Sequence, residues 1–595
     1  MTTRRAGRPV LAVVAVLLAL VAEMGLSGCV GLPDRGPVHS RSVADTGEAE
    51  TLVDYTPAGP RKGSSPTRLV EDFLTSMRAT PMTTHVAREY LASSTRARWA
   101  PDRGTVVYGS QRLVPAPGGG MLLRLRDVVE LDARGAWLGD PTHGRGRDYD
   151  LRLRREGGQW RIADLPDRLL IPRTHFDAQY QQYSLYFFDP TGQVLVPEPV
   201  YVPRGSEAST LLVAGLLRGP AAGLQQVERS YLPPGTRLDG ISVPVSLSGT
   251  AEAPLTSQVL GVGDSGREHI AAQLAWTLSQ ISTVERVRIT VDGAPLVPPG
   301  DVVQTDASTY DPSLGWASSA LFGVRARHVV TVEAGHEERL SGPFGALPLA
   351  PRTIAVDSLG QHVAGVSGDG RRLLVADRDG VPDRPAKTSD VRTLLRGRDL
   401  LTPVYDLHGQ LWVVDRTTAG ARLSVVRGGT ARTWAVPGVS GADVRHLLVS
   451  RDGTRLVVDR RRAGHDELVV LRVERDASGH VTGLGPAGPL AVEGASDRLL
   501  DIAWRSPSEI AVLTSPSSGT SEVLFAKLDG SSTASELSMD AALFRGRAVS
   551  LVTSPSREAP LALATAAGRL YTLTGRGRWT TSGVPTGLLA ATYVD

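Results

Sequence analysis

Cysteine is almost absent from this chain of 595 residues, which contains a single one, at position 29. A disulfide within the chain is therefore excluded, because there is no second thiol to pair with it. Cys29 also lies between an apolar run and a polar stretch, where a buried structural cysteine is not expected.

Lysine and asparagine are similarly scarce. There are three lysines (Lys62, Lys387 and Lys527) and no asparagine, although the 65 basic and 62 acidic residues give a net charge of +3. The basic residues are therefore almost all arginine, and they are interleaved with acidic residues along the whole chain instead of forming a basic block. This bias towards Arg, Ala, Gly and Pro is typical of a GC-rich genome. The sequence predicts no nucleic-acid partner.

The chain also lacks an apolar run long enough for a membrane-spanning helix. Such a helix needs about 20 apolar residues, whereas the run over residues 10–22 is interrupted by Glu23. A positively charged start, this short apolar stretch and small residues just before Cys29 have the layout of a secretory signal peptide. We therefore predict a signal peptide over residues 1–28.

The cleavage site of this peptide is formed by Leu26, Ser27, Gly28 and Cys29. These four residues resemble the bacterial lipobox. The resemblance implies that the thiol is diacylated, that the peptide is cut before Cys29, and that the new N-terminus is acylated as well. Two or three acyl chains anchor a protein stably, whereas one holds it only marginally. We expect a lipid-anchored protein on the extracytoplasmic face of the cell membrane.

Residues 29–63 are rich in Pro, Gly, Ser and charge, which is typical of a flexible tether.

The pattern changes over residues 64–175. Apolar residues recur at helical spacing over 69–77 behind Ser65, and a second helix is predicted over 84–99. Strands are predicted over 105–108, 121–131, 149–154 and 160–165. Two helices followed by an antiparallel sheet resemble the NTF2-like α+β fold, which serves many functions.

Residues 183–299 predict a second α+β domain. We expect strands over 184–188, 193–202, 238–247 and 284–291, with helices beginning at Ser206 and Ser265. Several of its segments resemble a GerMN domain: Leu185-Tyr186-Phe187, Leu217-Arg218-Gly219-Pro220, Leu232-Pro233-Pro234-Gly235-Thr236 and residues 271–293. That domain occurs in spore-germination and envelope proteins, and the resemblance implies a role in interactions, with no catalysis established.

Residues 321–595 are repetitive. An apolar strand, a tight turn and a second apolar strand recur five times, with turns at Gly360, Gly409, Gly453, Ser508 and Ser556. A further strand follows each copy, and four short strands in about 40–50 residues is the spacing of a β-propeller blade. Five blades are legible, while a sixth blade, or a closing strand over 588–593, stays open. The fold class is thus multidomain α+β and all-β.

Motifs that could carry chemistry are weak. Gly261, Gly263 and Gly266 spell G-x-G-x-x-G before a helix, but residues 253–258 before them are poor strand material, so we interpret this segment as a loop. The histidines are dispersed and predict no metal site. Four Asp-Gly pairs lack the spacing of calcium loops and are interpreted as hairpin turns. We predict no catalytic residue, no cofactor and no enzymatic activity.

The order of lipobox, NTF2-like domain, GerMN domain and propeller resembles the LpqB family of actinobacterial lipoproteins. Residues 31–34 (Gly-Leu-Pro-Asp), soon after the cysteine, share in this resemblance. It implies an accessory role beside the MtrA–MtrB two-component system, through contact with the extracytoplasmic part of the sensor histidine kinase MtrB, in envelope and division control. Two alternatives stay open: a glycan-binding protein or propeller enzyme acting on the cell wall, and a structural envelope spacer. The first would require convergent carboxylates or a metal in the propeller channel.

Overall fold

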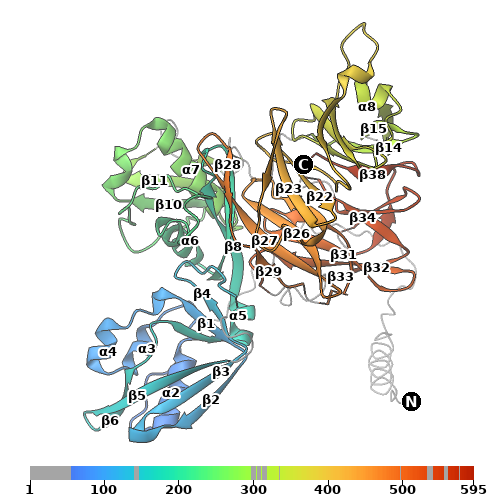
Figure 1. Cartoon of the computed structure of the whole chain (residues 1–595). Helices are drawn as coiled ribbons and strands as arrows, with labels where there is room; N and C mark the ends of the chain where they lie inside the picture. Colours follow the sequence, from blue (N-terminus) through green and yellow to red (C-terminus); the bar gives the residue numbers. More distant parts are fainter. Residues whose placement is uncertain are drawn as a thin grey trace, which may run out of the picture. The chain divides into compact units, whose positions relative to one another are not determined.

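The computed structural model describes residues 55–594 apart from 140–145, 297–302, 305–309, 311–317, 334, 493, 496, 532–540, 555–559 and 575–576 (Figure 1). The predicted signal peptide and its residues Leu26, Ser27, Gly28 and Cys29 lie outside the described residues, as does most of the predicted tether. No helix among the described residues is long and apolar enough to cross a membrane.

The first domain begins with helix α2 (Pro66–Ser76). The amide of Arg68 donates to the Ser65 hydroxyl at 3.3 Å, so the predicted N-cap is present. The prediction of one helix over 84–99 is wrong, because this segment forms two short helices, α3 (His85–Glu89) and α4 (Ser93–Arg98). Between them, Ala92 donates its amide to the Ile162 carbonyl at 2.8 Å. Backbone pairing with a neighbouring strand therefore interrupts the helix.

Two sheets complete this domain. One has the order β2-β3-β5-β6 and the other β4-β1-β7. Their strands are β1 (Thr105–Tyr108), β2 (Ser110–Pro115), β3 (Met121–Arg126), β4 (Val129–Leu131), β5 (Arg147–Glu156), β6 (Gln159–Asp164) and β7 (Leu169–Pro172). The prediction of one strand over 121–131 is wrong. Asp127 has a positive φ of 52°, a conformation that ends the extended chain, so β3 and β4 belong to different sheets.

The second domain contains the hairpin β8 (Tyr180–Phe188) and β9 (Leu195–Pro203), followed by helix α6 (Ala208–Leu217). Strand β10 (Thr250–Leu255) pairs in parallel with β11 (Arg286–Val291), and helix α7 (Asp264–Leu278) connects them. The predicted strand over 238–247 is wrong. This segment makes only isolated antiparallel bridges with β10, between Leu238 and Leu255 and between Val245 and Ala251. A turn, in which the Gly249 amide donates to the Ser246 carbonyl at 3.0 Å, separates it from that strand.

The structure of the second domain also corrects part of our interpretation of the G-x-G-x-x-G motif. Residues 253–255 do form part of a strand, and β10, α7 and β11 make a βαβ unit. However, a turn of 3₁₀ helix (Ser257–Gly261) separates the strand from the motif. A Cβ added at Gly261 or Gly263 would meet nothing within 4 Å. In the dinucleotide fingerprint, glycine is needed for a tight turn directly after the strand. Positions 261 and 263 do not require glycine, because a side chain would fit at both.

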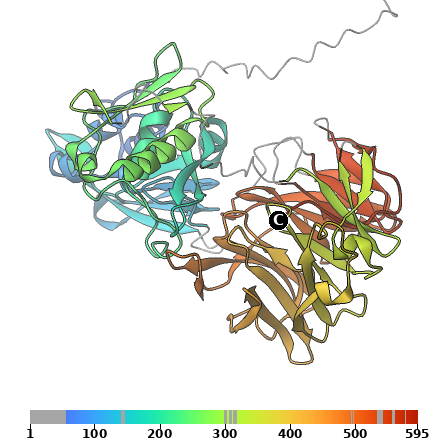
Figure 2. The same ribbon diagram turned by 90° about the horizontal axis from the view of Figure 1, so that it is seen from above.

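The third domain is a β-propeller. The described residues contain six sheets of four or five strands in this region, and Figures 1 and 2 show them following one another around a common centre, from yellow-green through orange to red. Five sheets correspond to the five repeats, and they begin with the innermost strands β17 (Thr353–Val356), β21 (Val404–Tyr405), β25 (Asp443–Val449), β30 (Leu499–Ser506) and β34 (Ala548–Val552).

Each of these innermost strands is followed by three or more strands that complete its sheet. They are β18 (His362–Val366), β19 (Arg372–Asp377), β20 (Arg392–Arg396), β22 (Leu411–Thr417), β23 (Gly420–Arg427), β24 (Thr430–Trp434), β26 (Arg455–Arg462), β27 (His465–Arg475), β28 (Val481–Leu484), β29 (Gly488–Leu490), β31 (Glu509–Ser517), β32 (Thr520–Lys527), β33 (Ala541–Arg545), β35 (Ala562–Thr565), β36 (Leu570–Leu573) and β37 (Trp579–Thr581).

The sequence left open whether there is a sixth blade or a closing strand over 588–593, and the sixth sheet contains both. Its strands β14 (Leu321–Arg325), β15 (His328–Glu333) and β16 (His336–Arg339) precede the first repeat, and β38 (Leu589–Thr592) pairs antiparallel with β14. The last strand of the chain thus completes the first sheet of the propeller (Figure 1). The propeller therefore has a sixth blade, and the closing strand β38 is one of its four strands.

A buried ion pair joins two adjacent blades. Arg475, at the end of β27, pairs with Asp406 at 2.6 Å, and both side chains are fully buried. The indole N–H of Trp412 donates to the same carboxylate at 2.8 Å. The two opposite charges compensate each other, and Trp412 adds a hydrogen bond to the carboxylate. This buried pair therefore avoids the cost of an uncompensated charge.

A second buried ionic cluster joins the hairpin β8–β9 to the propeller. The carboxylate of Glu198, on β9, pairs with Arg455 and with Arg472, whose Nη1 lies 2.8 Å from Oε1 of Glu198. Arg455 also pairs with Asp452 at 3.0 Å, and Glu228 lies 3.4 Å from Arg472. All of these groups except Arg472 are almost completely buried.

The pKa values of two carboxyls in this cluster are shifted in opposite directions. Burial alone would raise the pKa of Glu198, but the guanidinium groups of Arg472 and Arg455 hold it well below its usual range. Burial and the negative charge of Glu198 raise the pKa of Glu228 well above its ordinary value. Glu228 therefore keeps its proton to a higher pH than Glu198 does.

Candidate functional site

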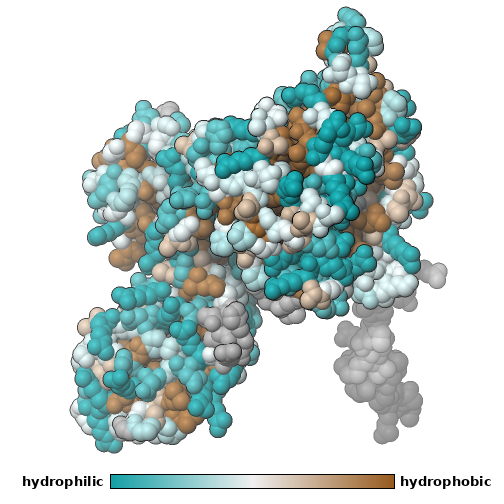
Figure 3. Space-filling model, viewed as in Figure 1, coloured by the Kyte–Doolittle hydropathy of each residue, from teal (hydrophilic) through white to brown (hydrophobic). Residues whose placement is uncertain are grey.

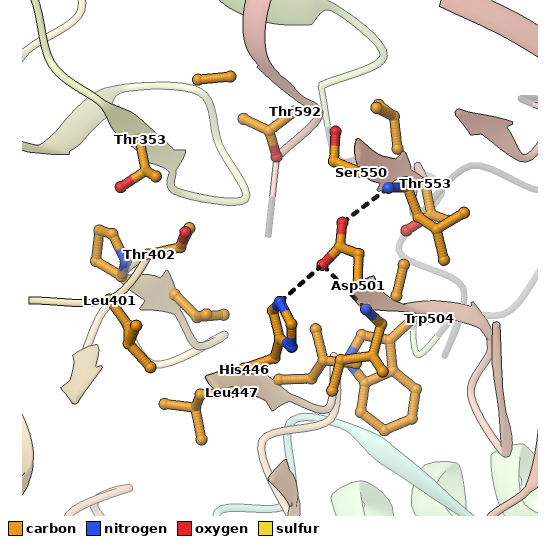
Figure 4. A pocket seen from close by; sticks show the side chains of 18 of the residues that line it. Thr353, Leu401, Thr402, His446, Leu447, Asp501, Trp504, Ser550, Thr553 and Thr592 are labelled. Atoms are coloured by element: carbon orange, nitrogen blue, oxygen red, sulfur yellow. Dashed lines mark hydrogen bonds and ion pairs between the residues drawn. The ribbon is translucent and has the colours of Figure 1, made fainter. Parts of the chain in front are cut away.

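A cavity of about 360 Å³ lies at the centre of the propeller, between the innermost strands of all six sheets. Its size is at the lower end of the range of small-molecule pockets, about 300–1,000 Å³. The walls are mixed, since apolar residues alternate with hydroxyl, carboxylate and imidazole groups (Figure 4). Among the residues that line it are Thr353, Thr402, His446, Asp501, Trp504, Ser550 and Thr592.

Three polar residues of the wall occupy equivalent positions on the innermost strands of three successive blades. His446 on β25, Asp501 on β30 and Ser550 on β34 each follow a break in the register with the next strand of their sheet. A β-bulge inserts one extra residue and turns the side chains that follow it. At each bulge a polar side chain lines the channel beside apolar residues of the same strand.

His446 is held between two carboxylates. Its Nδ1 lies 2.8 Å from Oδ2 of Asp459, which is opposite it on β26, and its Nε2 lies 3.9 Å from Oδ1 of Asp501. Burial alone would lower the pKa of the imidazole, but the hydrogen bond to Asp459 and the charge of Asp501 raise it above its ordinary value. His446 therefore keeps its proton to a higher pH than a free histidine.

Asp501 is fixed by the backbone of two strands. Its Oδ1 accepts the amide of Ile502 at 2.9 Å, and its Oδ2 accepts the amide of Leu551, on β34, at 2.7 Å. Burial raises the pKa of this carboxyl, and the proximity of His446 and the two amide bonds act in the opposite direction. The carboxylate is consequently a positioned hydrogen-bond acceptor in the wall of the cavity (Figure 4).

The pH dependence of stability should report on His446. Because its pKa is raised, its contribution to the free energy of unfolding is fully present below about pH 6.5 and is lost as the pH rises through the raised value. Asp459, Asp501 and Asp466 are the carboxylates that raise it. We expect the stability difference between the wild type and His446→Gln to shrink as the pH rises above about 6.5, as measured by urea denaturation. His480→Gln, at a half-exposed histidine, is the control, and a pH-independent difference for His446→Gln would contradict the assignment.

Sequence analysis did not identify this site. The only signal available was a histidine and an aspartate, each standing directly before one of the repeated apolar segments, and neither belongs to a known motif. Two of the four Asp-Gly pairs close hairpins as predicted, since Gly370 and Gly453 have positive φ angles and lie between paired strands. Gly530 also has a positive φ and closes a turn after β32. The prediction is wrong for Asp379-Gly380, which lies in the long connection between β19 and β20. Among the described residues there is no group of three or more His, Cys, Asp or Glu placed to hold a metal. One carboxylate, Asp501, lines the cavity.

The surface of the described domains is mixed. Hydrophilic residues cover much of the face shown in Figure 3, and hydrophobic residues appear in groups between them. A few large apolar side chains are well exposed, among them Ile241 and Leu247 in the second domain. Scattered apolar residues of this kind are normal on soluble domains.

Comparisons with known proteins cover all three domains. A family model described as the N-terminal domain of lipoprotein LpqB matches residues 59–177. A model described as sporulation and spore germination matches residues 184–297. The model of the LpqB beta-propeller domain matches residues 328–580. The three models match in the order in which the domains were predicted.

Whole-chain relatives and solved structures are also similar to this chain. Lipoprotein LpqB of Thermobifida fusca is 26% identical, covering 87% of this chain and 90% of its own length. Lipoprotein LpqB of Mycolicibacterium smegmatis is 28% identical, covering 87% and 88%. Tandem GerMN domains of the sporulation protein GerM from Bacillus subtilis match 27% of this chain and 58% of their own, at 19% identity and a TM-score of 0.19.

Proposed function

Because the chain belongs to the LpqB family of lipoproteins, we propose that it is a membrane-anchored, extracytoplasmic accessory protein of a two-component sensor kinase. The observation that carries this proposal is the match to named LpqB lipoproteins over 87% of the chain. In this proposal the thiol of Cys29 carries the lipid, and Leu26, Ser27 and Gly28 form the signal peptidase recognition sequence.

The proposed partner is the extracytoplasmic part of a sensor histidine kinase of the MtrB type. The proposal rests on the family resemblance, which implies a role in envelope and division control. The GerMN domain and the propeller offer broad folded surfaces for such a contact, and the buried cluster around Glu198 supports a fixed relation between them. The protein acts without catalysis in this proposal, and its relatives are named as lipoproteins and not as enzymes.

Cross-linking in intact cells tests the partner. We expect the full chain to be recovered covalently linked to the extracytoplasmic segment of a sensor kinase, identified by mass spectrometry of the cross-linked peptides. The matched control is the same chain without residues 321–595, which should lose the link if the propeller carries the contact. Recovery of no sensor kinase with the full chain would overturn the proposal.

A further inference from the structure

We propose that the central cavity of the propeller binds one small, neutral, polyhydroxylated molecule such as a monosaccharide or a cyclitol. The cavity has about 360 Å³ of space and is lined by every blade. This inference does not depend on the sensor-kinase role, because it concerns residues in the channel of the propeller. It also differs from the binding of a wall glycan, since the cavity takes a small molecule and not a polymer.

The polar groups of the cavity are distributed over opposite walls. The carboxylate of Asp501 and the imidazole of His446 lie on one side, and the side chains of Thr353 and Thr402 lie across from them (Figure 4). The Thr353 hydroxyl is buried and has no hydrogen-bond partner among the described residues. A ligand hydroxyl that pairs with it would satisfy a polar group that the protein leaves without a partner, and this favours binding.

The hydrogen-bonding chemistry of the walls fits alcohol groups. A carboxylate accepts, an imidazole nitrogen donates or accepts according to its tautomer, and threonine and serine hydroxyls do both. Each hydroxyl of a polyol can likewise donate and accept, so one such ligand can satisfy all of these groups. The side chains of Ile354, Leu401 and Leu447 also line the cavity and can contact the C–H faces of a ring.

The charges of the cavity argue against a charged ligand. Three of its cationic side chains already have carboxylate partners within 2.8 Å: Arg352 with Asp399, Arg445 with Asp443, and His446 with Asp459. A fourth, Arg451, donates to the Ser554 carbonyl at 2.6 Å. An anion would meet the carboxylate of Asp501, and a cation would meet the guanidinium groups of Arg352, Arg445 and Arg451. A purely apolar ligand would leave the carboxylate and the hydroxyls buried without partners.

Binding to the detergent-solubilised full chain tests this inference. The probes are D-glucose, N-acetyl-D-glucosamine and myo-inositol, with inorganic phosphate, acetate and choline as charged comparators. Saturation-transfer NMR detects binding, and isothermal titration calorimetry measures the dissociation constant. We expect saturable binding of at least one of the three polyols, and weaker binding of every charged comparator.

Two variants locate the binding in the cavity. Thr353→Val keeps the shape of the side chain and removes a hydroxyl that has no partner in the protein, so the fold should be retained. It should weaken binding of the polyol by roughly three- to tenfold, as expected for one lost hydrogen bond, and Ser550→Ala should act in the same direction. Thr430→Val, at an exposed position on β24, is the matched control and should leave the dissociation constant unchanged.

Three results would overturn the inference. The first is the absence of saturable binding for all three polyols. The second is tighter binding of phosphate, acetate or choline than of any polyol. The third is polyol binding that Thr353→Val and Ser550→Ala leave unchanged, because the molecule would then bind outside the cavity. None of these outcomes depends on whether a sensor kinase is recovered by cross-linking.

Discussion

Replacing Cys29 by alanine should move the protein from the membrane fraction to the soluble fraction. The thiol is the only site in the chain to which a diacylglyceryl group can be attached through sulfur. Each acyl CH₂ that enters the bilayer contributes about 0.8 kcal/mol, so losing two or three chains removes essentially all of the membrane affinity. Immunoblotting of fractionated cells measures the distribution, and metabolic labelling with palmitate detects the lipid.

The control for this experiment is Ser40→Ala, a substitution in the predicted tether that leaves the four lipobox residues intact. It should fractionate with the membrane like the wild type. The circular dichroism of purified Cys29→Ala should match that of the wild type, because Cys29 lies outside the three folded domains. Palmitate incorporation by Cys29→Ala, with retention in the membrane, would show that the lipobox assignment is wrong.

Glu198→Ala should destabilise the contact between the hairpin β8–β9 and the propeller by about 3–5 kcal/mol, the usual cost of removing one partner from a buried ion pair. The guanidinium groups of Arg455 and Arg472 would lose their shared carboxylate, and the Arg455 side chain has only 3% of its surface exposed. Urea denaturation measures the change. Limited proteolysis between the second and third domains measures whether their contact has opened.

Two further variants make this result specific. Glu252→Ala removes a glutamate of the same domain from an ion pair with Arg288, at 3.2 Å. Because that pair is about half exposed, its loss should cost no more than about 1 kcal/mol. Replacing Glu198, Arg455 and Arg472 together by apolar residues of similar size should recover part of the lost stability. Equal effects of Glu198→Ala and Glu252→Ala would exclude a role for the buried cluster.

The sequence was most informative where the pattern is local. The cap of α2 at Ser65 and the alternation along β5 follow from hydrogen bonding and burial within a few residues. The repeat of the propeller was legible because each blade reproduces the same strand–turn–strand unit. The errors occurred where a distant contact decided the local structure. Residues 84–99 form two helices because the backbone at Ala92 pairs with a strand about seventy residues later.

The candidate site likewise depends on contacts between residues that are far apart in the sequence. His446 and Asp501 are 55 positions apart in the sequence and meet because their blades are adjacent in the ring of sheets. The bulges that bring them to the channel wall have no sequence signature, since they depend on the register between two strands. Glu198 and Arg455 are more than two hundred residues apart, and no pattern in the sequence relates them.

The sequence by itself determined the order of the domains, the repeated blades and the prediction of a lipid at Cys29, because each depends on residues that are close together along the chain. Only the tertiary structure decided that β38 completes the first blade, that Glu198 is buried between two arginines, and that His446 lies beside Asp501 in the wall of the central cavity. These features require the pairing of distant strands and the exclusion of water around charges, and both arise only when the chain has folded.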